Sequence, residues 1–364
     1  MKSACRGNRN LRLLFLADGE SVHTKRFLSY FVNKGYDIHL VTSTAKPIRG
    51  VNIHELKFSL ARNSGLFAYA SFPLRILSIS KTIKKINPDI LHAHYILNYG
   101  FCGVLSGFHP FVLSVLGSDL TRSHNIKKLV AKYVIACSDV IDGFVLRERL
   151  IKLGCDSNKI FPYSWGVNTD TFSPRVRQNN LAKNEYSVIC PRYWKPMYSV
   201  ETFIRAIPLV QKTMQNVKFV LVGGGELENN LKELSRELSV YDDIEWIGLV
   251  PEDEMPKYLA NADICVDTFP RYVGIGQTTR QAMSCGTPCM ITKSLDNPNA
   301  EMDFECLTYK PRDYQDLAEK LVFLLNRESL RRTMGENSRK YALEFFDENK
   351  NMKLMENVYH NLVK

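Results

Sequence analysis

The sequence has no long hydrophobic runs. No apolar stretch approaches the roughly 18 residues that a helix needs to cross a bilayer. The segment MKSACRGNRN at the start of the chain has no apolar core like that of a signal peptide. These absences exclude insertion through a hydrophobic segment. We therefore expect a cytoplasmic protein, with at most peripheral contact with the inner face of the membrane.

The sequence also lacks paired cysteines. Its nine cysteines form no CxxC pair and show no metal-like spacing with histidine. In a reducing compartment such cysteines are most simply small buried residues. No paired acidic motif stands at the end of an expected strand either. We predict no disulfide framework, no cofactor and no metal.

Negative charge is scarce in the first half of the chain. Residues 1–174 carry 23 lysines and arginines against 11 aspartates and glutamates, a net charge of +12, whereas the remainder has a net charge of −2. This asymmetry suggests a surface that meets an anionic partner, such as acidic lipid, nucleic acid or a phosphorylated acceptor, and the alternative is simply a well-solvated basic surface. Of these partners we do not expect nucleic acid. The segment Leu66–Lys85 suits an anionic membrane surface. A core-facing helix explains its apolar positions equally well.

The length and composition indicate a folded protein with two domains. The chain has 364 residues, of which 45% are hydrophobic and 24% charged. Short β-branched runs alternate with longer amphipathic stretches, which predicts parallel sheets covered by helices. The expected strands are Leu11–Ala17, Asp37–Thr42, Asp89–His92, Phe111–Val115, Val140–Val145, Lys159–Tyr163, Tyr186–Cys190, Val217–Val222, Asp243–Ile247, Asp263–Asp267 and Pro288–Thr292. The expected helices lie near His23–Lys34, Tyr69–Ile86, Ile126–Cys137, Val200–Thr213, Leu227–Leu238, Glu252–Leu259, Thr278–Cys285 and Tyr314–Leu325.

A polar segment separates the two series of elements. Trp165–Lys183 shows neither the helix nor the strand period, so we interpret it as the linker. The predicted domains are residues 1–174 and 175–344, and the helix expected at 345–364 could pack back onto the first. Two doubly wound α/β domains in series would face each other across a cleft, where ligands bind at the carboxyl ends of the strands.

One stretch predicts a phosphate site. Residues Gly274–Pro288, GIGQTTRQAMSCGTP, form a short Gly-rich turn that runs into a helix. Such a turn presents unpaired backbone N–H groups and the positive end of a helix dipole at one place. The alternative is an ordinary helix cap, for which threonine is equally suited.

Seven further short motifs are spread over nearly the whole chain. They are DGESVHTKR at Asp18–Arg26, PDILHAHY at Pro88–Tyr95, GSD at Gly117–Asp119, GVNTDTFSP at Gly166–Pro174, PRYWK at Pro191–Lys195, VGGGE at Val222–Glu226 and IGLVP at Ile247–Pro251. In this order they resemble the group 1 (family 4) retaining glycosyltransferases. The resemblance implies the GT-B architecture, in which two Rossmann-like domains bind the acceptor in the first domain and the nucleotide-sugar in the second.

The resemblance also implies the donor-side residues. Arg192 would grip the diphosphate, with Lys195 in place of a family lysine because Met197 occupies that lysine's position. The backbone of the Gly-rich turn and the two threonine hydroxyls would complete the cradle, and the turn after Ile247 would meet the base. The predicted nucleotide-sugar residues are Arg192, Lys195, Gly224, Gly248, Val250, Gly274, Gly276, Gln277, Thr278, Thr279 and Gln281.

Two carboxylates of the family pattern are missing. The family brackets the turn with two glutamates, and here Val273 and Gln281 stand at those positions. Gln281 can still hydrogen-bond to ribose as a neutral group. Val273 cannot bind the transferred sugar by a side-chain hydrogen bond. A front-face retaining transfer tolerates this loss, because the departing phosphate can itself take the acceptor's proton.

The acceptor side is less well marked. Leu116 stands where the family often has a histidine, so Asp119 and His23 are the predicted catalytic residues, with Gly19 and His94 on the acceptor side. A turn-capping role for Asp119 and structural roles for the histidines are the alternatives.

These observations favour a retaining glycosyltransferase that transfers a sugar from a nucleoside-diphosphate sugar to a lipid-linked or otherwise anionic acceptor. The absent carboxylates leave a second hypothesis open, a non-catalytic sugar-nucleotide-binding protein acting as a regulatory or partner subunit. A sugar-nucleotide epimerase is a third hypothesis, but its characteristic residues are not evident.

Overall fold

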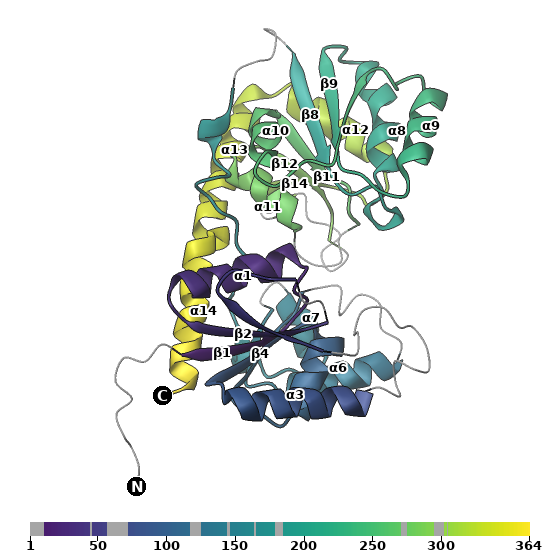
Figure 1. Ribbon diagram of the computed structural model, residues 1–364. Helices are drawn as coiled ribbons and strands as arrows, with labels where there is room; N and C mark the ends of the chain where they lie inside the picture. The colour runs from purple at the N-terminus through teal and green to yellow at the C-terminus, as the bar shows by residue number, and fades with distance from the viewer. Residues whose placement is uncertain are drawn as a thin grey trace. The chain divides into compact units, whose positions relative to one another are not determined.

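The computed structural model describes residues 11–43, 46–56, 72–116, 125–143, 146–163, 165–178, 185–270, 275–294, 302–303 and 305–364. The chain forms two compact units, Met1–Ser164 with Met352–Lys364, and Trp165–Asn351. The domain boundary expected after residue 174 lies inside the second unit. Figure 1 shows each unit as a sheet with helices packed on it.

The first unit contains a seven-stranded parallel sheet with the order β3-β2-β1-β4-β5-β6-β7. Its strands are β1 Arg12–Leu16, β2 Asp37–Thr42, β3 Val51–Glu55, β4 Ile90–His94, β5 Phe111–Ser114, β6 Val140–Asp142 and β7 Ile160–Phe161. The helices are α1 Val22–Asn33, α3 Phe72–Ile86, α4 Phe101–Leu105, α6 Asn125–Cys137 and α7 Arg147–Lys152, with a π-helical segment at Tyr95–Gly100. The strand order reverses between β1 and β4, so this is the topological switch point of the sheet.

The second unit repeats this design. Its seven strands have the order β10-β9-β8-β11-β12-β14-β13, and all neighbours are parallel except β13 and β14. The strands are β8 Tyr186–Pro191, β9 Val217–Val222, β10 Ile244–Gly248, β11 Ile264–Asp267, β12 Cys289–Thr292, β13 Met302–Asp303 and β14 Cys306–Tyr309. The helices are α8 Glu201–Gln211, α9 Glu228–Glu237, α10 Met255–Asn261, α11 Gln277–Ser284, α12 Tyr314–Leu325 and α13 Glu328–Tyr341. The last helix, α14 Glu348–Leu362, begins in the second unit, and its residues from Met352 onward belong to the first. The switch point lies between β8 and β11.

These two parallel sheets confirm the predicted doubly wound α/β class. The sequence pattern missed β3 at one edge of the first sheet, because none of its residues is fully buried and it has no continuous apolar run. It also missed β14, which is short and interrupted by Thr308. Strands such as β4 and β5, which the sequence pattern found, are buried along their whole length, as expected for parallel strands covered on both faces.

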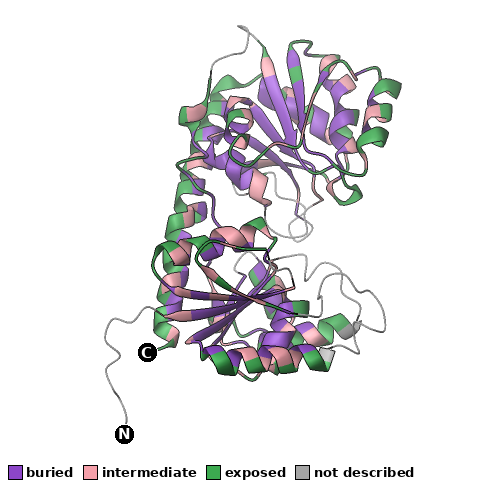
Figure 2. Cartoon of the chain, in the orientation of Figure 1, coloured by how far each residue is buried: buried purple, intermediate pink, exposed green. Residues whose placement is uncertain are grey.

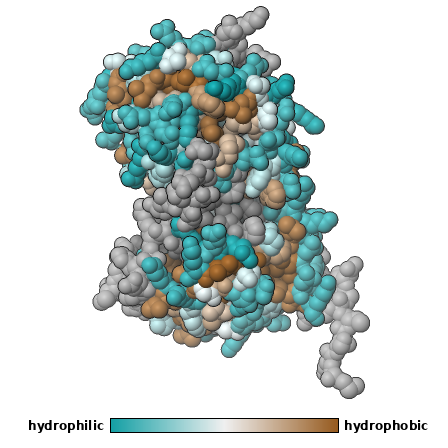
Figure 3. All heavy atoms as spheres, turned by 180° about the vertical axis from the view of Figure 1, so that it is seen from behind, coloured by the Kyte–Doolittle hydropathy of each residue, from teal (hydrophilic) through white to brown (hydrophobic). Residues whose placement is uncertain are grey.

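The core of the second unit lies on both faces of its sheet. Alternate residues of one strand point to opposite faces. Val188 and Cys190 of β8 therefore join a cluster with Phe203 and Leu321, whereas Ile189 joins a cluster on the opposite face. Figure 2 shows buried strands, with exposed residues on the outer sides of the helices. In the view from behind, hydrophobic residues at the surface gather in a band on the second unit and in smaller patches on the first (Figure 3).

The last helix ends against the first sheet. Tyr359 of α14 is fully buried, and its hydroxyl lies 2.5 Å from Nδ1 of His92 in β4. Nε2 of His92 lies 2.7 Å from the Ser114 hydroxyl, which donates to the Asp142 carboxylate. When Asp142 is ionised it only accepts, so every donor in this chain points toward it: Tyr359 to His92, His92 to Ser114, Ser114 to Asp142.

This buried chain has unusual protonation behaviour. Burial raises the pKa of Asp142 to about 7, although the Ser114 hydroxyl and the Val115 N–H oppose the shift. Burial lowers the pKa of His92 well below its usual value, and the neighbouring His94 lowers it further. The imidazole is therefore neutral at physiological pH.

The described helices include none that is both long and apolar enough to cross a membrane.

Candidate functional site

A buried ion pair occupies the switch point of the second sheet. Arg192 follows β8, and Asp267 ends the neighbouring strand β11. Nε of Arg192 donates to Oδ1 of Asp267 at 2.7 Å, and Nη2 donates to Oδ2. The two side chains are only 8% and 2% exposed. This is the place in a doubly wound sheet where ligands bind.

The surroundings keep Arg192 charged and fixed. Burial opposes its charge, but Asp267 outweighs burial and raises the pKa of the guanidinium. The Thr279 hydroxyl accepts from Nη2 at 3.0 Å and donates to Oδ2 of Asp267 at 2.8 Å. The guanidinium is therefore held in one orientation by two side chains from β11 and α11.

The N-terminus of α11 lies against this guanidinium. Gly276 is the N-cap, and no side chain caps the helix there. A Cβ built on Gly276 would lie 2.7 Å from Nη2 and 2.8 Å from Nη1 of Arg192, so only glycine leaves room for the guanidinium. The first N–H groups of a helix have no partner within it. The dipole, these N–H groups and the guanidinium are the kinds of group that bind phosphate oxygens in proteins.

The glycine turn after β9 supports the Arg192 loop. Gly223 and Gly225 have φ values of 151° and 154°, in the region that favours glycine. A Cβ on Gly225 would lie 2.5 Å from the Trp194 carbonyl, and one on Gly224 would lie 2.9 Å from Cγ of Leu249. The backbone of this turn thus packs closely between the loops that follow β8 and β10.

Two predicted donor residues have different surroundings from those expected. Lys195 is exposed, and its ammonium lies 6.0 Å from the centre of the Tyr193 ring. The Thr279 hydroxyl is buried and bonded to the ion pair. In this structure the hydrogen bonds of this hydroxyl orient Arg192. Thr278 is only half-buried, on the first turn of α11.

The two glutamines of α11 have separate partners. The Gln277 amide donates to the Gly166 carbonyl at 2.8 Å. Gln281 is 6% exposed, and its amide donates to Oε1 of Glu252 at 3.3 Å. Gly248, with φ 80°, is the last residue of β10, and the loop that follows carries the half-buried Val250 and Glu252.

The acceptor-side predictions fall in the first unit. The N–H of Gly19, just after β1, donates to the Thr42 hydroxyl at 3.0 Å, and His23 lies half-buried in the first turn of α1. Asp119 lies outside the described residues, as do Gly274 and Val273 on the donor side.

His94, predicted to lie on the acceptor side, is placed in the core of the first unit. Its side chain is fully buried, with its ring centre 5.6 Å from that of Phe27 and 6.1 Å from that of Phe15. Burial and, to a lesser extent, the charge of His23 together lower its pKa to about 3. Residues two apart in a strand share a face, so His92 and His94 both point into the core. His94 is therefore a neutral core residue.

Sequence reasoning missed Asp267 and Glu252. Asp267 ends a strand that was itself predicted, and Arg192 follows another predicted strand. The signal that could have shown that Arg192 and Asp267 meet is the strand order. β8 and β11 are neighbours because the order of the strands reverses at that point in the sheet. Nothing in the local sequence marks Glu252.

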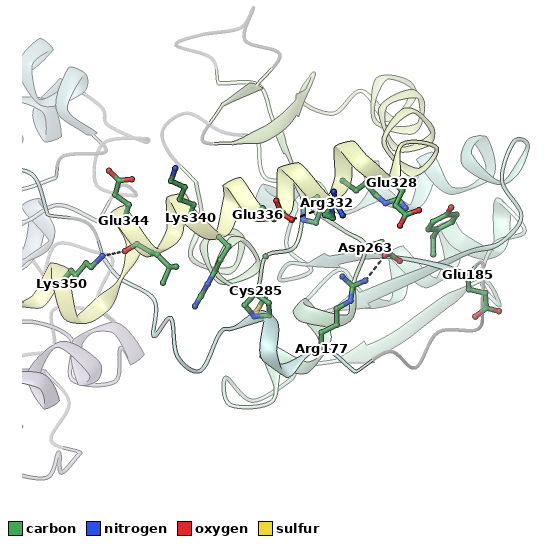
Figure 4. Close-up of a pocket in the computed structure, with 18 residues that line it drawn as sticks. Arg177, Glu185, Asp263, Cys285, Glu328, Arg332, Glu336, Lys340, Glu344 and Lys350 are labelled. Carbon is green, nitrogen blue, oxygen red and sulfur yellow. Dashed lines mark hydrogen bonds and ion pairs between the residues drawn. The ribbon is translucent and has the colours of Figure 1, made fainter.

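A groove of about 910 Å³ lies at the opposite end of the second sheet. Its lining includes Tyr186 at the start of β8, and Asp263 and Pro288, which precede β11 and β12. Figure 4 shows several of its charged side chains along α13 and its continuation. Many are bonded within the chain: Arg177 pairs with Asp263 at 3.2 Å, and Lys350 donates to the Leu343 carbonyl at 2.8 Å. The groove therefore lies apart from the switch-point site, and its charges serve to hold the unit together.

Comparison with known proteins agrees with this geometry. A family model described as glycosyl transferase 4-like matches residues 12–144, and one described as glycosyl transferases group 1 matches residues 173–341. The N-acetyl-alpha-D-glucosaminyl L-malate synthase of Bacillus anthracis is 22% identical over 364 residues, covering 91% of this chain and 91% of the synthase.

Solved structures show the same fold. Sucrose-phosphate synthase from Thermosynechococcus elongatus is similar with a TM-score of 0.79 at 17% identity, covering 97% of this chain and 99% of that one. HepE from Anabaena, in complex with UDP-glucose, is similar with a TM-score of 0.74 at 16% identity, covering 96% and 99%.

Proposed function

The chain belongs to the group 1 glycosyltransferases of GT-B fold, which transfer a sugar from a nucleotide-sugar, and we propose that it is a retaining enzyme acting on a lipid-linked or otherwise anionic acceptor at the cytosolic face of a membrane. The observation that carries the donor side is the Arg192–Asp267 pair at the uncapped start of α11. Breaking a sugar–diphosphate bond builds negative charge on the leaving group, and a fixed guanidinium beside helix N–H groups stabilises that charge.

The proposed chemistry needs no carboxylate from the turn. The bond between the anomeric carbon and the β-phosphate oxygen breaks while the acceptor oxygen bonds to the same face of the sugar. The acceptor's proton passes to the departing phosphate oxygen. The chain's residues hold the reactants and stabilise the leaving group. In this proposal Arg192 and the backbone of Gly276, Gln277 and Thr278 bind the diphosphate.

His23 and Asp119 are proposed to meet the acceptor, since each follows a strand of the first sheet. Gly274, Gly224 and Lys195 would line the donor side, and Gly248 and Val250 the base. UDP-glucose is the first donor to test, because the HepE structure, which shares this fold, holds it.

The membrane contact is proposed for the outer faces of α3 and α6. α3 buries Ile79 and Ile83 but exposes Leu74 at 51% and Leu77 at 57%. A core-packing role and a membrane-binding role for α3 are therefore compatible, because its inner face packs in the core while its outer face is apolar and basic. On α6, Leu129 is 67% exposed and Tyr133 is 48% exposed. Exposed lysines flank these residues: Lys81, Lys84, Lys85, Lys127, Lys128 and Lys132. Apolar side chains with lysines suit an anionic bilayer surface.

Donor binding and turnover test the proposed reaction. Calorimetry with UDP-glucose and other nucleoside-diphosphate sugars should show binding, and incubation with membrane lipid extracts should show transfer with retained anomeric configuration. Binding without hydrolysis or transfer to any acceptor would support the non-catalytic subunit instead. Conversion of the donor in the absence of acceptor would indicate an epimerase.

Vesicle flotation tests the membrane contact separately. Full-length protein should float with vesicles containing phosphatidylserine and should not float with neutral phosphatidylcholine vesicles. Replacing Lys127 and Lys128 by glutamate should release it, whereas the same change at Lys232 and Lys257 in the second unit should not. Equal flotation of both variants would overturn this part of the proposal.

A further inference from the structure

Four buried side chains of the first unit form a chain of hydrogen bonds that crosses three strands and ends on the last helix. They are Asp142 in β6, Ser114 in β5, His92 in β4 and Tyr359 in α14. None of the four is more than 1% exposed. Bulk water therefore does not reach these groups, and each must satisfy the next.

The ionised carboxylate gives this chain one direction. It only accepts, so the Ser114 hydroxyl donates to Oδ2 of Asp142. His92 then donates from Nε2 to the Ser114 oxygen at 2.7 Å, and its Nδ1 accepts from Tyr359 at 2.5 Å. Three hydrogens thus occupy three links, and the neutral imidazole carries its hydrogen on Nε2.

A proton taken up by Asp142 does not fit this arrangement. It adds a fourth hydrogen to three links, so one hydrogen must leave the chain at one end. Oδ1 of Asp142 faces the N–H of Val115 at 3.3 Å, and a backbone N–H cannot become an acceptor. Oδ2 faces the Ser114 hydroxyl, which can rotate from donor to acceptor. The proton therefore settles on Oδ2.

Protonation of Oδ2 reverses every link. Asp142 donates to the Ser114 oxygen, and Ser114 donates to Nε2 of His92. Nδ1 of His92 then carries the hydrogen and donates to the Tyr359 oxygen. The hydrogen that leaves the chain is that of the Tyr359 hydroxyl, at the opposite end. The imidazole stays neutral throughout and changes only its tautomer.

The surroundings allow this exchange near neutral pH. Burial raises the pKa of Asp142 to about 7, although its two hydrogen bonds oppose the shift. The other titratable groups whose charges act on the histidine and the tyrosine include His94 in β4, Tyr163 after β7 and Tyr36 before β2. Burial and, to a lesser extent, the charge of His23 in α1 lower the pKa of His94 to about 3, so His94 is neutral in this range.

We infer that this chain of four side chains is a two-state relay, in which uptake of one proton by the buried carboxyl switches the tautomer of His92 and turns the Tyr359 hydroxyl on the last helix. Above the titration of Asp142 the hydrogen bonds point toward the carboxylate, and below it they point toward Tyr359. The relay lies in the first unit and is independent of the proposed donor site.

The tautomer of His92 tests the inference. NMR of the full chain with isotope-labelled histidine distinguishes a ring nitrogen that carries a hydrogen from one that does not. Between about pH 9 and about pH 5, His92 should change from the Nε2–H to the Nδ1–H form. The change should have the same midpoint as the carboxyl carbon signal of Asp142. His94, neutral throughout this range, is the internal control and should keep one tautomer.

Three variants separate the relay from a general effect of pH. Asp142→Asn places an NH₂ donor opposite Ser114, so His92 should hold the Nδ1–H form at every pH. Ser114→Ala removes the middle link, and the His92 tautomer should then no longer follow the carboxyl. The matched control is Ser138→Ala, because the Ser138 hydroxyl is also buried but donates to the Val134 carbonyl at 2.8 Å. This control should switch like the wild-type chain.

Three results would overturn the relay. The first is a wild-type His92 that keeps the Nε2–H form, or gains a second ring hydrogen, while Asp142 titrates. The second is a carboxyl that stays ionised down to about pH 4, its ordinary range. The third is switching in Ser114→Ala at the wild-type midpoint, which would show that the charge of Asp142 acts on His92 without the hydroxyl. Switching lost in Ser114→Ala and kept in Ser138→Ala supports the relay.

Discussion

The two sheets share one strand order around their switch points, yet they bury different polar groups near them. In the second unit a charged arginine lies beside an aspartate and against the uncapped start of a helix. In the first unit the paired histidines of β4 are neutral, fully buried and surrounded by aromatic rings. The second arrangement presents charge to a ligand, whereas the first fastens the last helix to the sheet through His92 and Tyr359.

The comparison shows that a polar residue at a strand end is not by itself a site. His94 ends β4 and Arg192 follows β8, so each lies beside the switch point of its own sheet, and both were predicted to meet substrate. Their surroundings have opposite effects: Asp267 keeps Arg192 charged, while burial and the charge of His23 lower the pKa of His94 and keep it neutral.

The largest expected effect is the loss of Asp267. Asp267→Ala leaves the buried guanidinium of Arg192 without its counter-charge, which should lower the free energy of unfolding by about 3–5 kcal/mol in urea denaturation. The control is Glu245→Ala, whose exposed pair with Lys218 at 2.8 Å should be worth less than about 1 kcal/mol. Similar losses of unfolding free energy in the two variants would mean that the buried Arg192–Asp267 pair matters no more to stability than an exposed ion pair.

The buried groups of the first unit should show opposing pH dependence. The pKa of Asp142 is raised from 3.8 to about 7, so its contribution to stability is complete below pH 3.8 and is lost as the pH rises through 7. The pKa of His94 is lowered from 6.5 to about 3, so its contribution is complete above pH 6.5 and is lost as the pH falls through 3.

The Asp142→Asn variant separates these two effects. Without Asp142 the histidines dominate, and the free energy of unfolding should rise with pH more steeply than in the wild-type chain between about pH 4 and 6.5. His94→Gln should shift the slope in the opposite direction. Urea denaturation at a series of pH values measures both, and an Asp142→Asn profile parallel to the wild-type profile would contradict the assignment.

Substitution of one glycine in each unit compares the two units by their effect on donor affinity. In Gly276→Ala the new Cβ would crowd Arg192, so donor affinity should fall by about 10-fold, the loss of one charge-assisted contact. In Gly19→Ala the Cβ would lie 3.3 Å from the Thr42 hydroxyl, a milder contact in the first unit. Gly19→Ala should leave donor affinity unchanged in calorimetry. An equal loss in both variants would show a general effect of packing rather than a donor site.

The smallest effect is expected at His23. His23→Ala should reduce the rate of transfer by a few-fold, on the order of 1 kcal/mol, without changing donor affinity, because it lies in the first unit. Steady-state kinetics with separate donor and acceptor titrations measure this. A change confined to the donor KM would contradict its acceptor-side role.

Much of the architecture could be predicted from the sequence because it depends on local pattern. Buried strands such as β1 and β8 are continuous apolar runs, and the GIGQTTRQ turn marks the start of α11. The residues that complete the site depend on strand order instead. Asp267 meets Arg192 only because β11 lies next to β8, and Glu252 meets Gln281 only because α10 packs against α11. The burial of His94 also could not be predicted locally, because the alternation that places it on the same face as His92 turns both side chains into the core.

The most direct test of the central claim is donor binding by a chain in which the ion pair is replaced by apolar side chains. The double variant Arg192→Met with Asp267→Leu removes both charges together, so it should recover most of the stability lost in Asp267→Ala. Calorimetry on this folded variant should show no measurable binding of a donor that binds the wild-type chain. Binding with wild-type affinity would show that the diphosphate does not depend on Arg192.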